Sequence, residues 1–384
     1  METTTTATLR IGVIGVGRIG RMHAELLARQ VPGAAVTWIH DEFEASARAV
    51  ADALGAVVAT DLDELLAAPE VDAVAICSPT DTHAELIVAA AEAGKAIFCE
   101  KPVSLDLAEV DRALGAVEAA GVPFQIGFNR RFDPAHEAVA GAVAAGEIGE
   151  PQLVRISSRD PAPPPVSYIR VSGGIFLDMT IHDFDMARYV TGSEVVEVYA
   201  RGGVRIDPEI GEAADVDTAV VLLEHANGCL TTIDNSRQAV YGYDQRVEVF
   251  GSGGMAASEN PLAHTAVVRD ADGLRGATLP YFYLERLNEL QVYLAEDELH
   301  TGYRTVFGGD RFPYHGHFVP GSANGIGFED LVAIEDYEFC RAIAEGRPFP
   351  PGFAEAVEWV SVQAALLKSA QSGAWEDVVS LRED

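Results

Sequence analysis

A glycine-rich segment near the N-terminus has the residue types and spacing of a phosphate-binding loop. Gly15, Gly17 and Gly20 form the pattern GxGxxG directly after a short apolar stretch and at the start of a helical pattern. In such a turn the first glycine permits the tight bend, the second lets the backbone approach a pyrophosphate, and the third allows helix and strand to pack closely. The phosphates would lie on free N–H groups at the positive end of the helix dipole.

Asp41 indicates which dinucleotide this loop would bind. It closes the second predicted strand, 21 residues after Gly20, where a carboxylate accepts hydrogen bonds from the adenosine ribose hydroxyls. Glu42 follows, and no Lys or Arg is adjacent to neutralise a 2′-phosphate. The pattern therefore predicts NAD rather than NADP; the alternative is an ordinary glycine turn that binds no nucleotide.

Lys101 is the first candidate for catalysis. The chain has only three lysines, and this one lies in the tripeptide Glu100-Lys101-Pro102 at the C-terminal end of a predicted parallel strand. Doubly wound sheets bind their ligands at this end of the strands. A partly buried ammonium there can bond a reacting oxygen and stabilise negative charge on it. The alternative is a surface lysine in a turn.

Asp178 and His182 are the second candidate. If a helix begins near Asp178, the two side chains are four residues apart and share a face. A histidine tuned by a carboxylate suits general acid–base chemistry near neutral pH. A structural histidine paired with its helical neighbour is the first alternative. A metal site that adds Asp183 and Asp185 is the second, and we disfavour it because these two should point elsewhere and no second histidine is near.

Apolar strands and helices alternate up to residue 127, and they would position the glycine loop, Asp41 and Lys101. Strands are expected at 9–14, 35–39, 57–58, 71–77, 96–99 and 123–127, with helices at 19–30, 44–54, 62–67, 82–93 and 107–120. Apolar strands joined by crossover helices predict an α/β Rossmann domain with a doubly wound parallel sheet.

The pattern changes after residue 129. One helix at 134–145 leads into period-2 strands at 152–158, 195–205, 218–223, 229–235 and 246–251, and helices follow at 329–345 and 354–372. Strands without intervening helices predict an α+β domain with a large, mainly antiparallel open sheet. We therefore expect an NAD-binding domain at 1–128 and a substrate-binding and oligomerisation domain at 129–384, whose last helices can pack back on the first domain. A chain of 384 residues agrees with two domains at about 150 residues each.

Composition narrows the function classes further. Lys+Arg 27 against Asp+Glu 59 gives a net charge of −32, which disfavours nucleic acid and anionic membrane surfaces as partners. The four cysteines are widely spaced, which argues against a disulfide framework and a thiolate zinc site. No signal peptide and no run of about 18 apolar residues is recognisable. We expect a soluble, cytoplasmic protein.

Three motifs together resemble one known family. GVGRIG at 15–20, EKP at 100–102 and GGIFLDMTIHDFD at 173–185 resemble the Gfo/Idh/MocA oxidoreductases, most closely the inositol 2-dehydrogenases. The likeness runs from about residue 9 to 260 and includes GFNRRFDP (127–134), SSRDPAPPP (157–165) and YGYDQRVEVFGSGGM (241–255). It implies that Lys101 is the catalytic lysine, that Asp178 and His182 are catalytic and substrate-binding groups, and that the peptide bond before Pro102 is cis.

The resemblance also implies two sets of binding residues. The NAD contacts would be Gly15, Gly17, Arg18, Ile19, Gly20, Asp41, Ser78, Pro79, Thr80, His83, Glu100, Lys101 and Gln125. The substrate contacts would be Lys101, Arg130, Arg131, Asp160, Asp178, Thr180, His182 and Tyr243.

One segment departs from the inositol dehydrogenase pattern. Residues 287–327 are longer than usual there, and FPYHGHFVPGSANGIGFEDL (312–331) is more similar to relatives that oxidise pyranoses or anhydrosugars. His315 and His317 would reach a substrate pocket, or they decorate a surface or interface loop.

The residues and the resemblance together give one expected function and three rivals. We expect NAD-dependent oxidation of a secondary hydroxyl of a cyclic polyol, most closely an inositol. The rivals are a pyranose or anhydrosugar dehydrogenase of the glucoside 3-dehydrogenase or levoglucosan dehydrogenase type, an NAD-dependent glycosidase or lyase, and a non-catalytic dinucleotide sensor. The open sheet offers a face for self-association, and because relatives are usually tetramers we expect a homo-oligomer.

Overall fold

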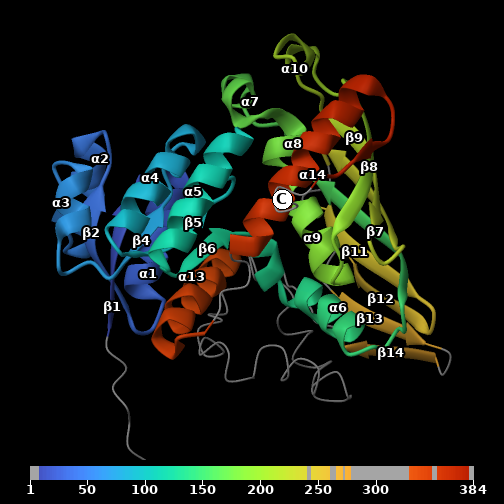
Figure 1. Cartoon of the computed structure of the whole chain (residues 1–384), viewed down its shortest axis with the longest axis horizontal. Coiled ribbons are helices and arrows are strands. Elements are labelled where there is room, and N and C mark those ends of the chain that lie inside the picture. Colours follow the sequence, from blue (N-terminus) through green and yellow to red (C-terminus); the bar gives the residue numbers. More distant parts are fainter. Residues whose placement is uncertain are drawn as a thin grey trace, which may run out of the picture. The chain divides into compact units, whose positions relative to one another are not determined.

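The structure is a computed structural model that describes residues 8–239, 244–259, 265–270, 273–277, 328–347 and 353–379. The chain divides into two compact units (Figure 1). The first comprises Met1–Asn129 and Phe328–Val360, and the second comprises Arg130–Gly327 and Ser361–Asp384.

The first unit is built on a six-stranded parallel sheet in the order β3-β2-β1-β4-β5-β6. β4, β5, β6 and most of β1 are buried, as the continuous apolar runs predicted, whereas β2 and β3 are partly exposed. The strands are β1 (Leu9–Ile14), β2 (Ala34–His40), β3 (Val57–Val58), β4 (Ala73–Ile76), β5 (Ala96–Glu100) and β6 (Phe124–Gly127). The predicted Rossmann-type sheet is confirmed, and the strand order reverses direction between β1 and β4.

Five crossover helices join these strands: α1 (Arg18–Arg29), α2 (Glu44–Leu54), α3 (Leu62–Ala67), α4 (Thr80–Glu92) and α5 (Leu107–Ala120). Local sequence explains where they start and stop. Asp61 and Asp106 accept backbone N–H bonds at the N-termini of α3 and α5, and Gly55 and Gly121 end α2 and α5 in the left-handed conformation. Because crossovers are right-handed, the reversal at β1 and β4 places α1 and α2 on one face and α4 and α5 on the other.

A helix from late in the sequence completes the first unit. α13 (Phe328–Glu345) packs along α1, where Val332 and Ala333 contact Leu26. Phe339 and Cys340 join the core formed by α1, α2 and the sheet. The predicted division counted this segment with residues 129–384 but allowed the last helices to pack back on the first domain; the contacts assign Phe328–Val360 to the first unit.

The second unit is built on a nine-stranded sheet in the order β14-β13-β12-β11-β7-β10-β9-β8-β15. Its neighbouring strands are antiparallel except for the parallel pair β7 and β10. The predicted mainly antiparallel sheet is thus confirmed. The strands are β7 (Pro151–Arg159), β8 (Val195–Gly203), β9 (Thr218–His225), β10 (Leu230–Ser236), β11 (Asp244–Gly251), β12 (Gly254–Glu259), β13 (Thr265–Asp270), β14 (Gly273–Ala277) and β15 (Glu376–Asp377).

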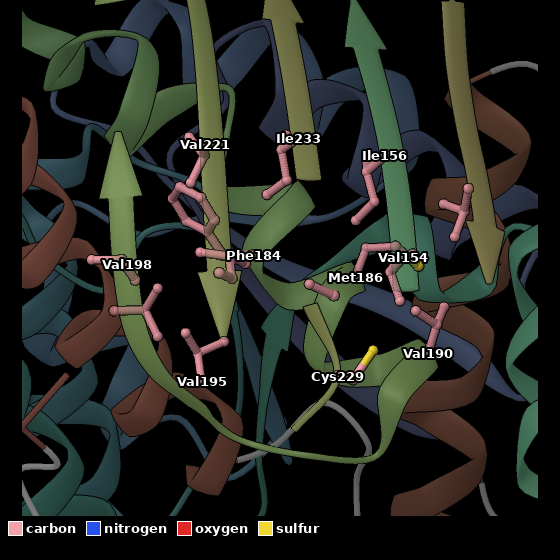
Figure 2. Packing of buried hydrophobic residues seen from close by; sticks show 14 of the residues in the cluster. Val154, Ile156, Phe184, Met186, Val190, Val195, Val198, Val221, Cys229 and Ile233 are labelled. Carbon is pink, nitrogen blue, oxygen red and sulfur yellow. The ribbon is translucent and has the colours of Figure 1, made fainter. Parts of the chain in front are cut away.

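Helices cover one face of this sheet. α6 (Pro134–Ala144), α9 (Ile181–Thr191) and α14 (Phe353–Ser372) contribute side chains to a core with the inward-facing strand residues. Figure 2 shows Phe184 and Met186 of α9 among Val154, Ile156 and Val221 of the sheet. Shorter helical pieces are η1 (Asn129–Phe132), α7 (Val166–Ser172), α8 (Gly174–Asp178) and α10 (Pro208–Glu212). No helix in the described part of the chain has the length and apolarity needed to cross a bilayer.

Candidate active site

The glycine loop between β1 and α1 has the shape of a dinucleotide cradle. Gly15 has φ 86°, and a Cβ on it would lie 2.6 Å from the Ser78 backbone. A Cβ on Gly20 would lie 1.9 Å from the carbonyl oxygen of Gly15, so both positions require glycine. A Cβ on Gly17 would meet nothing within 4 Å. The middle glycine therefore leaves open space for a pyrophosphate, beside the N–H groups of Arg18 and Ile19 in the first turn of α1.

Asp41 is fixed at the edge of this loop. Its Oδ2 accepts the N–H of Val16 at 2.8 Å, and its Oδ1 accepts the N–H of Phe43 at 2.9 Å. A carboxylate has about four acceptor positions, and the side chain is only partly buried. The N–H groups of Val16 and Phe43 therefore hold Asp41 in place, and its remaining acceptor positions can bind a ribose hydroxyl.

The loop from β4 to α4 faces the glycine loop. The Ser78 backbone lies against Gly15, Pro79 occupies the N-cap position of α4 without a side-chain capping bond, and Thr80 begins the helix. The loop follows β4 where the strand order reverses, and ligands of doubly wound sheets bind in the crevice at such a point.

His83 braces this region from inside the protein. It is 1% exposed. Its Nδ1 lies 2.7 Å from the Pro102 carbonyl oxygen and its Nε2 lies 2.9 Å from that of Ser78. Both ring nitrogens thus face backbone oxygens, which gives His83 the role of joining the Ser78 loop to the turn after Lys101.

Lys101 follows the last residue of β5, and the Lys101–Pro102 peptide bond is cis, as the resemblance implied. The Glu100 carboxylate accepts the backbone N–H of Lys101 at 3.2 Å through Oε2, while its Oε1 lies 3.1 Å from His23 Nε2. Gln125 in β6 is buried, and its amide donates to the Glu335 carbonyl oxygen of α13 at 3.4 Å. We did not predict His23, although its place on the buried face of α1 is readable from the apolar spacing.

The helix that we expected to begin near Asp178 is interrupted. Asp178 ends α8 and His182 is the second residue of α9. The break lies at Thr180, whose N–H and hydroxyl both bond the Ile175 carbonyl oxygen, at 2.9 and 3.1 Å. Since Met179 N–H also bonds this oxygen, α8 closes on itself and α9 starts afresh. The expected uninterrupted helix from Asp178 is therefore wrong, and the pairing of Asp178 with His182 stays a prediction.

Asp178 has two partners that the sequence did not indicate. Tyr168 of α7 donates its hydroxyl to Oδ1 of Asp178 at 2.8 Å. Arg237, which is 1% exposed, places Nη1 3.8 Å from Oδ2 of Asp178 and Nη2 3.2 Å from Asp215. The carboxylate is thus oriented from two sides within the second unit.

Buried ion pairs support the start of α9. Arg130 bonds Asp183 at 2.5 Å, and Arg131 forms a two-point pair with Asp185 at 2.6 and 2.8 Å. Burial raises the pKa of Asp183 although the arginine opposes this shift. These pairs fix the segment that carries His182, so the structure uses both guanidinium groups to hold η1 against α9.

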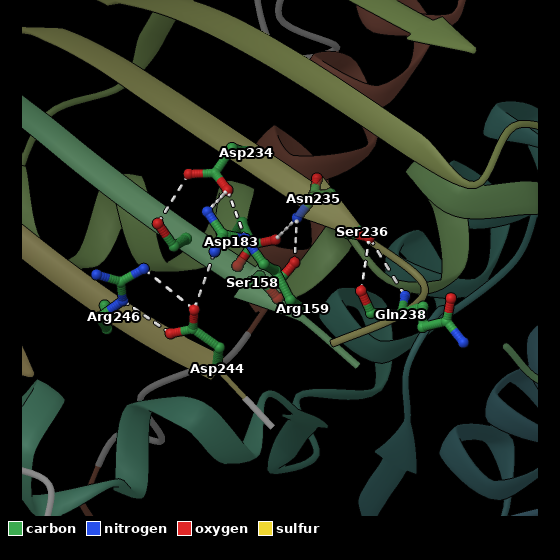
Figure 3. A network of polar contacts seen from close by, with 10 residues as sticks. Ser158, Arg159, Asp183, Asp234, Asn235, Ser236, Gln238, Asp244 and Arg246 are labelled. Carbon is green, nitrogen blue, oxygen red and sulfur yellow. Dashed lines mark hydrogen bonds and ion pairs between the residues drawn. The ribbon is translucent and has the colours of Figure 1, made fainter. Parts of the chain in front are cut away.

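A polar network continues from Asp183 into the sheet (Figure 3). Asn235 of β10 donates to Asp183 at 2.7 Å and accepts from the Thr180 hydroxyl at 2.8 Å. Ser158 accepts a bond from Arg130 at 3.0 Å. Thr180 itself is fully buried. Thr180 and Asp183, which flank His182 in the chain, are thus held by Asn235 and Arg130.

Of the remaining predicted residues, one lies in the described part of the chain and three lie outside it. Asp160 follows β7, is partly buried, and exchanges backbone bonds with Ser236 and Ala239. Tyr243, His315 and His317 lie outside the described residues. Within the described ranges, no group of three His, Cys, Asp or Glu side chains is arranged to hold a metal ion.

Comparison with known proteins identifies the class. Residues 9–128 match the oxidoreductase family with an NAD-binding Rossmann fold, GFO_IDH_MocA, and residues 136–257 match the GFO/IDH/MocA C-terminal domain. The chain belongs to this family, and it is an NAD-dependent oxidoreductase. The match confirms both the family resemblance and the NAD-binding domain predicted from the glycine loop.

Individual relatives narrow the comparison. The chain is 53% identical over 303 residues to myo-inositol 2-dehydrogenase of Thermotoga maritima, covering 79% of this chain and 89% of the relative. It is 47% identical over 296 residues to inositol 2-dehydrogenase of Rhizobium meliloti, covering 76% and 89%. The crystal structure of a putative myo-inositol dehydrogenase from Sinorhizobium meliloti superimposes with TM-score 0.77 at 39% identity, covering 97% of this chain and all of that one.

Proposed function

We propose that this protein oxidises a secondary hydroxyl of an inositol to the ketone with NAD. The observation that carries the proposal is 53% identity across 89% of a myo-inositol 2-dehydrogenase, in a chain that retains Lys101, Asp178 and His182. A sensor that had lost catalysis would be expected to lose the lysine or the histidine.

Each unit contributes a different part of the chemistry. The glycine loop and Asp41 bind the dinucleotide, whose nicotinamide supplies the hydride acceptor. His182 removes the hydroxyl proton, and Asp178 orients the histidine and supports its charge. Lys101 donates to the substrate oxygen and stabilises negative charge that develops on it. Holding these groups in fixed positions is the main contribution of the protein.

The structure supports these roles through the partners of each side chain. Tyr168 and Arg237 orient Asp178. The two arginine–aspartate pairs at Asp183 and Asp185 fix the first turn of α9 around His182. We propose Asp160 as a carboxylate that reads substrate hydroxyls, since a mismatched epimer would leave a buried polar group unpaired.

The test is formation of NADH from the purified protein, NAD and a panel of inositols and pyranoses. NADH with an inositol as the best substrate supports the proposal. Turnover restricted to pyranoses or anhydrosugars would replace the inositol with a sugar. A tightly retained cofactor without net NADH would instead indicate the glycosidase or lyase chemistry.

We also propose that the protein forms a homo-oligomer through the outer face of the nine-stranded sheet. Val220, Leu230 and Phe250 are 50%, 45% and 48% exposed on strands whose neighbouring residues are buried. Exposed apolar side chains grouped on one sheet face are typical of an interface. Sedimentation velocity gives the mass directly, and a monomer at micromolar concentration would contradict the proposal.

A further inference from the structure

A chain of three buried ionisable side chains crosses the interior of the first unit. His23 of α1 places Nδ1 2.8 Å from Asp336 Oδ1 and Nε2 3.1 Å from Glu100 Oε1. Asp336 belongs to α13 and Glu100 ends β5. The side chains are 0%, 2% and 15% exposed in the order His23, Asp336, Glu100. The chain thus connects a helix late in the sequence with the residue before Lys101.

The contacts of His23 favour a proton on both ring nitrogens. A neutral imidazole has one N–H donor, whereas each nitrogen of His23 faces a carboxylate oxygen. Burial disfavours the charge, but the Asp336 and Glu100 carboxylates outweigh it and raise the pKa of His23 well above its usual range. Burial alone would raise the pKa of Glu100, and the His23 bond reverses the direction and lowers it. The contacts and the raised pKa of His23 favour its charged form between the two acids, while burial raises the pKa of Asp336.

Glu100 connects His23 to the backbone of Lys101. Its second oxygen, Oε2, accepts the backbone N–H of Lys101 at 3.2 Å. The carboxylate lies against Gly127 of β6, where an added Cβ would approach Oε2 to 3.3 Å. Phe98 contacts the ring of His23 with a centroid distance of 5.0 Å, and Phe339 of α13 packs on Phe98 at 5.8 Å. These contacts restrict the movement of both the His23 ring and the Glu100 carboxylate.

We propose that His23 and Asp336 are positioning residues of the dehydrogenase, which act through Glu100 to fix the Lys101 backbone and so the ammonium that Lys101 presents to substrate. This proposal rests on the role of Lys101 in the proposed function. Apolar side chains of similar size can join helices to a sheet without burying three ionisable groups. Unlike apolar packing, the chain of Asp336, His23 and Glu100 ends in a directional hydrogen bond to one group, the backbone N–H of Lys101.

The kinetic test compares Asp336→Asn and His23→Gln with the control Glu338→Gln. Glu338 is a carboxylate on the same helix that pairs with Arg341 and Arg347 instead. Asp336→Asn keeps the shape of the side chain and removes its charge. We expect kcat to fall roughly ten- to a hundredfold, as for a small displacement of a catalytic group. The NAD dissociation constant and the KM of inositol should stay unchanged, and the control should behave as wild type.

A double variant separates a shared path from two independent effects. If Asp336 acts through His23, the double variant loses no more kcat than the more damaging single variant, because interacting residues are not additive. Additive losses, or a kcat for Asp336→Asn equal to that of the control, would overturn the proposal. If Asp336→Asn does not fold, Gly127→Ala moves the Glu100 carboxylate without removing any charge, and it should lower kcat in the same way.

A second readout does not depend on turnover. The chain has three lysines, Lys95, Lys101 and Lys368, so a protein labelled with [13Cε]lysine gives three signals that single Lys→Arg variants assign. Asp336→Asn should shift the Lys101 signal and leave the other two in place. If the wild type oxidises no polyol but this shift occurs, the positioning chain stands and the proposed substrate fails. If the enzyme is active and Lys101 does not shift, the positioning chain fails alone.

Discussion

Tyr168 lies half exposed on a short helix, yet its hydroxyl reaches one of the residues that we assign to catalysis. The bond to Asp178 is 2.8 Å long, and the second oxygen of this carboxylate faces Arg237. Because Arg237 is buried and positively charged, it stabilises the negative charge of the Asp178 carboxylate. The tyrosine hydroxyl fixes the rotation of the carboxylate, and in the proposed function this rotation sets how Asp178 orients His182.

Tyr168→Phe should therefore lower kcat by about three- to tenfold while the protein stays folded, because a partly exposed hydrogen bond to a charged group is worth on the order of 1 kcal/mol. Steady-state kinetics with inositol measure the change. Tyr199→Phe, a tyrosine of β8 that packs on Trp375, is the matched control. Equal kinetics for the two variants would contradict the orienting role of Tyr168.

Asp217 performs a purely structural task at the same scale. Its carboxylate accepts backbone N–H bonds from Arg205, Ile206 and Asp207 at 2.7, 2.8 and 3.1 Å. Burial raises its pKa, but these bonds outweigh burial and lower the pKa below its usual value. The stabilisation is therefore complete above the unfolded-state pKa of about 3.9 and disappears as the pH falls through the lower folded-state value.

Asp217→Asn should cost about 1–3 kcal/mol of unfolding free energy at neutral pH, since the amide is a weaker acceptor for these bonds. The difference between wild type and variant should shrink as the pH falls below about 4. Urea unfolding at several pH values measures it. A difference that does not change with pH would show that charge on Asp217 plays no part.

At the scale of elements, the glycines of the loop between β1 and α1 meet two different requirements, backbone packing and ligand binding. A Cβ on Gly20 would collide with the Gly15 carbonyl oxygen, whereas a Cβ on Gly17 would enter open space. One glycine is needed by the fold, and the other is needed by the ligand.

Gly17→Ala should therefore fold with wild-type thermal stability and lose NAD affinity by at least an order of magnitude, because the methyl group occupies the space that the pyrophosphate approaches. Gly20→Ala should be destabilised even without NAD. Thermal unfolding without cofactor and titration calorimetry with NAD distinguish the two. Loss of stability in Gly17→Ala, or normal stability in Gly20→Ala, would contradict this division.

The sequence predicted most elements because their signals are local. β1, β4, β5 and β6 are largely buried apolar runs, and the bounds of α2, α3 and α5 follow from capping residues and apolar spacing. The sequence did not predict the break at Thr180, because it depends on a hydroxyl that bonds backwards to Ile175 and across to Asn235. Pairings such as Arg237 with Asp178 and His23 with Asp336 join residues far apart in the chain, and no local pattern indicates them.

At the scale of the whole molecule, the chain enters the second unit after residue 129 and returns to the first with α13. This helix covers Leu26 and supplies Phe339 to the core of the first sheet. A fragment of residues 1–129 would expose that apolar surface and leave His23 without Asp336.

The fragment 1–129 should accordingly unfold at a lower temperature than the full chain, and a version in which residues 328–347 follow residue 129 through a flexible linker should recover part of the loss. Calorimetric scans of both fragments measure the effect. Equal stability with and without α13 would show that the Rossmann sheet is complete on its own.

The return of α13 also bears on how the protein is made. N-terminal domains usually fold first as a chain is synthesised. Here the N-terminal sheet is completed by α13, which is synthesised about two hundred residues after β6. Most strands of the second unit are synthesised in between. The unit whose synthesis begins first is thus completed only after most of the second unit has been made, and until then its unclosed apolar surface is open to chaperones.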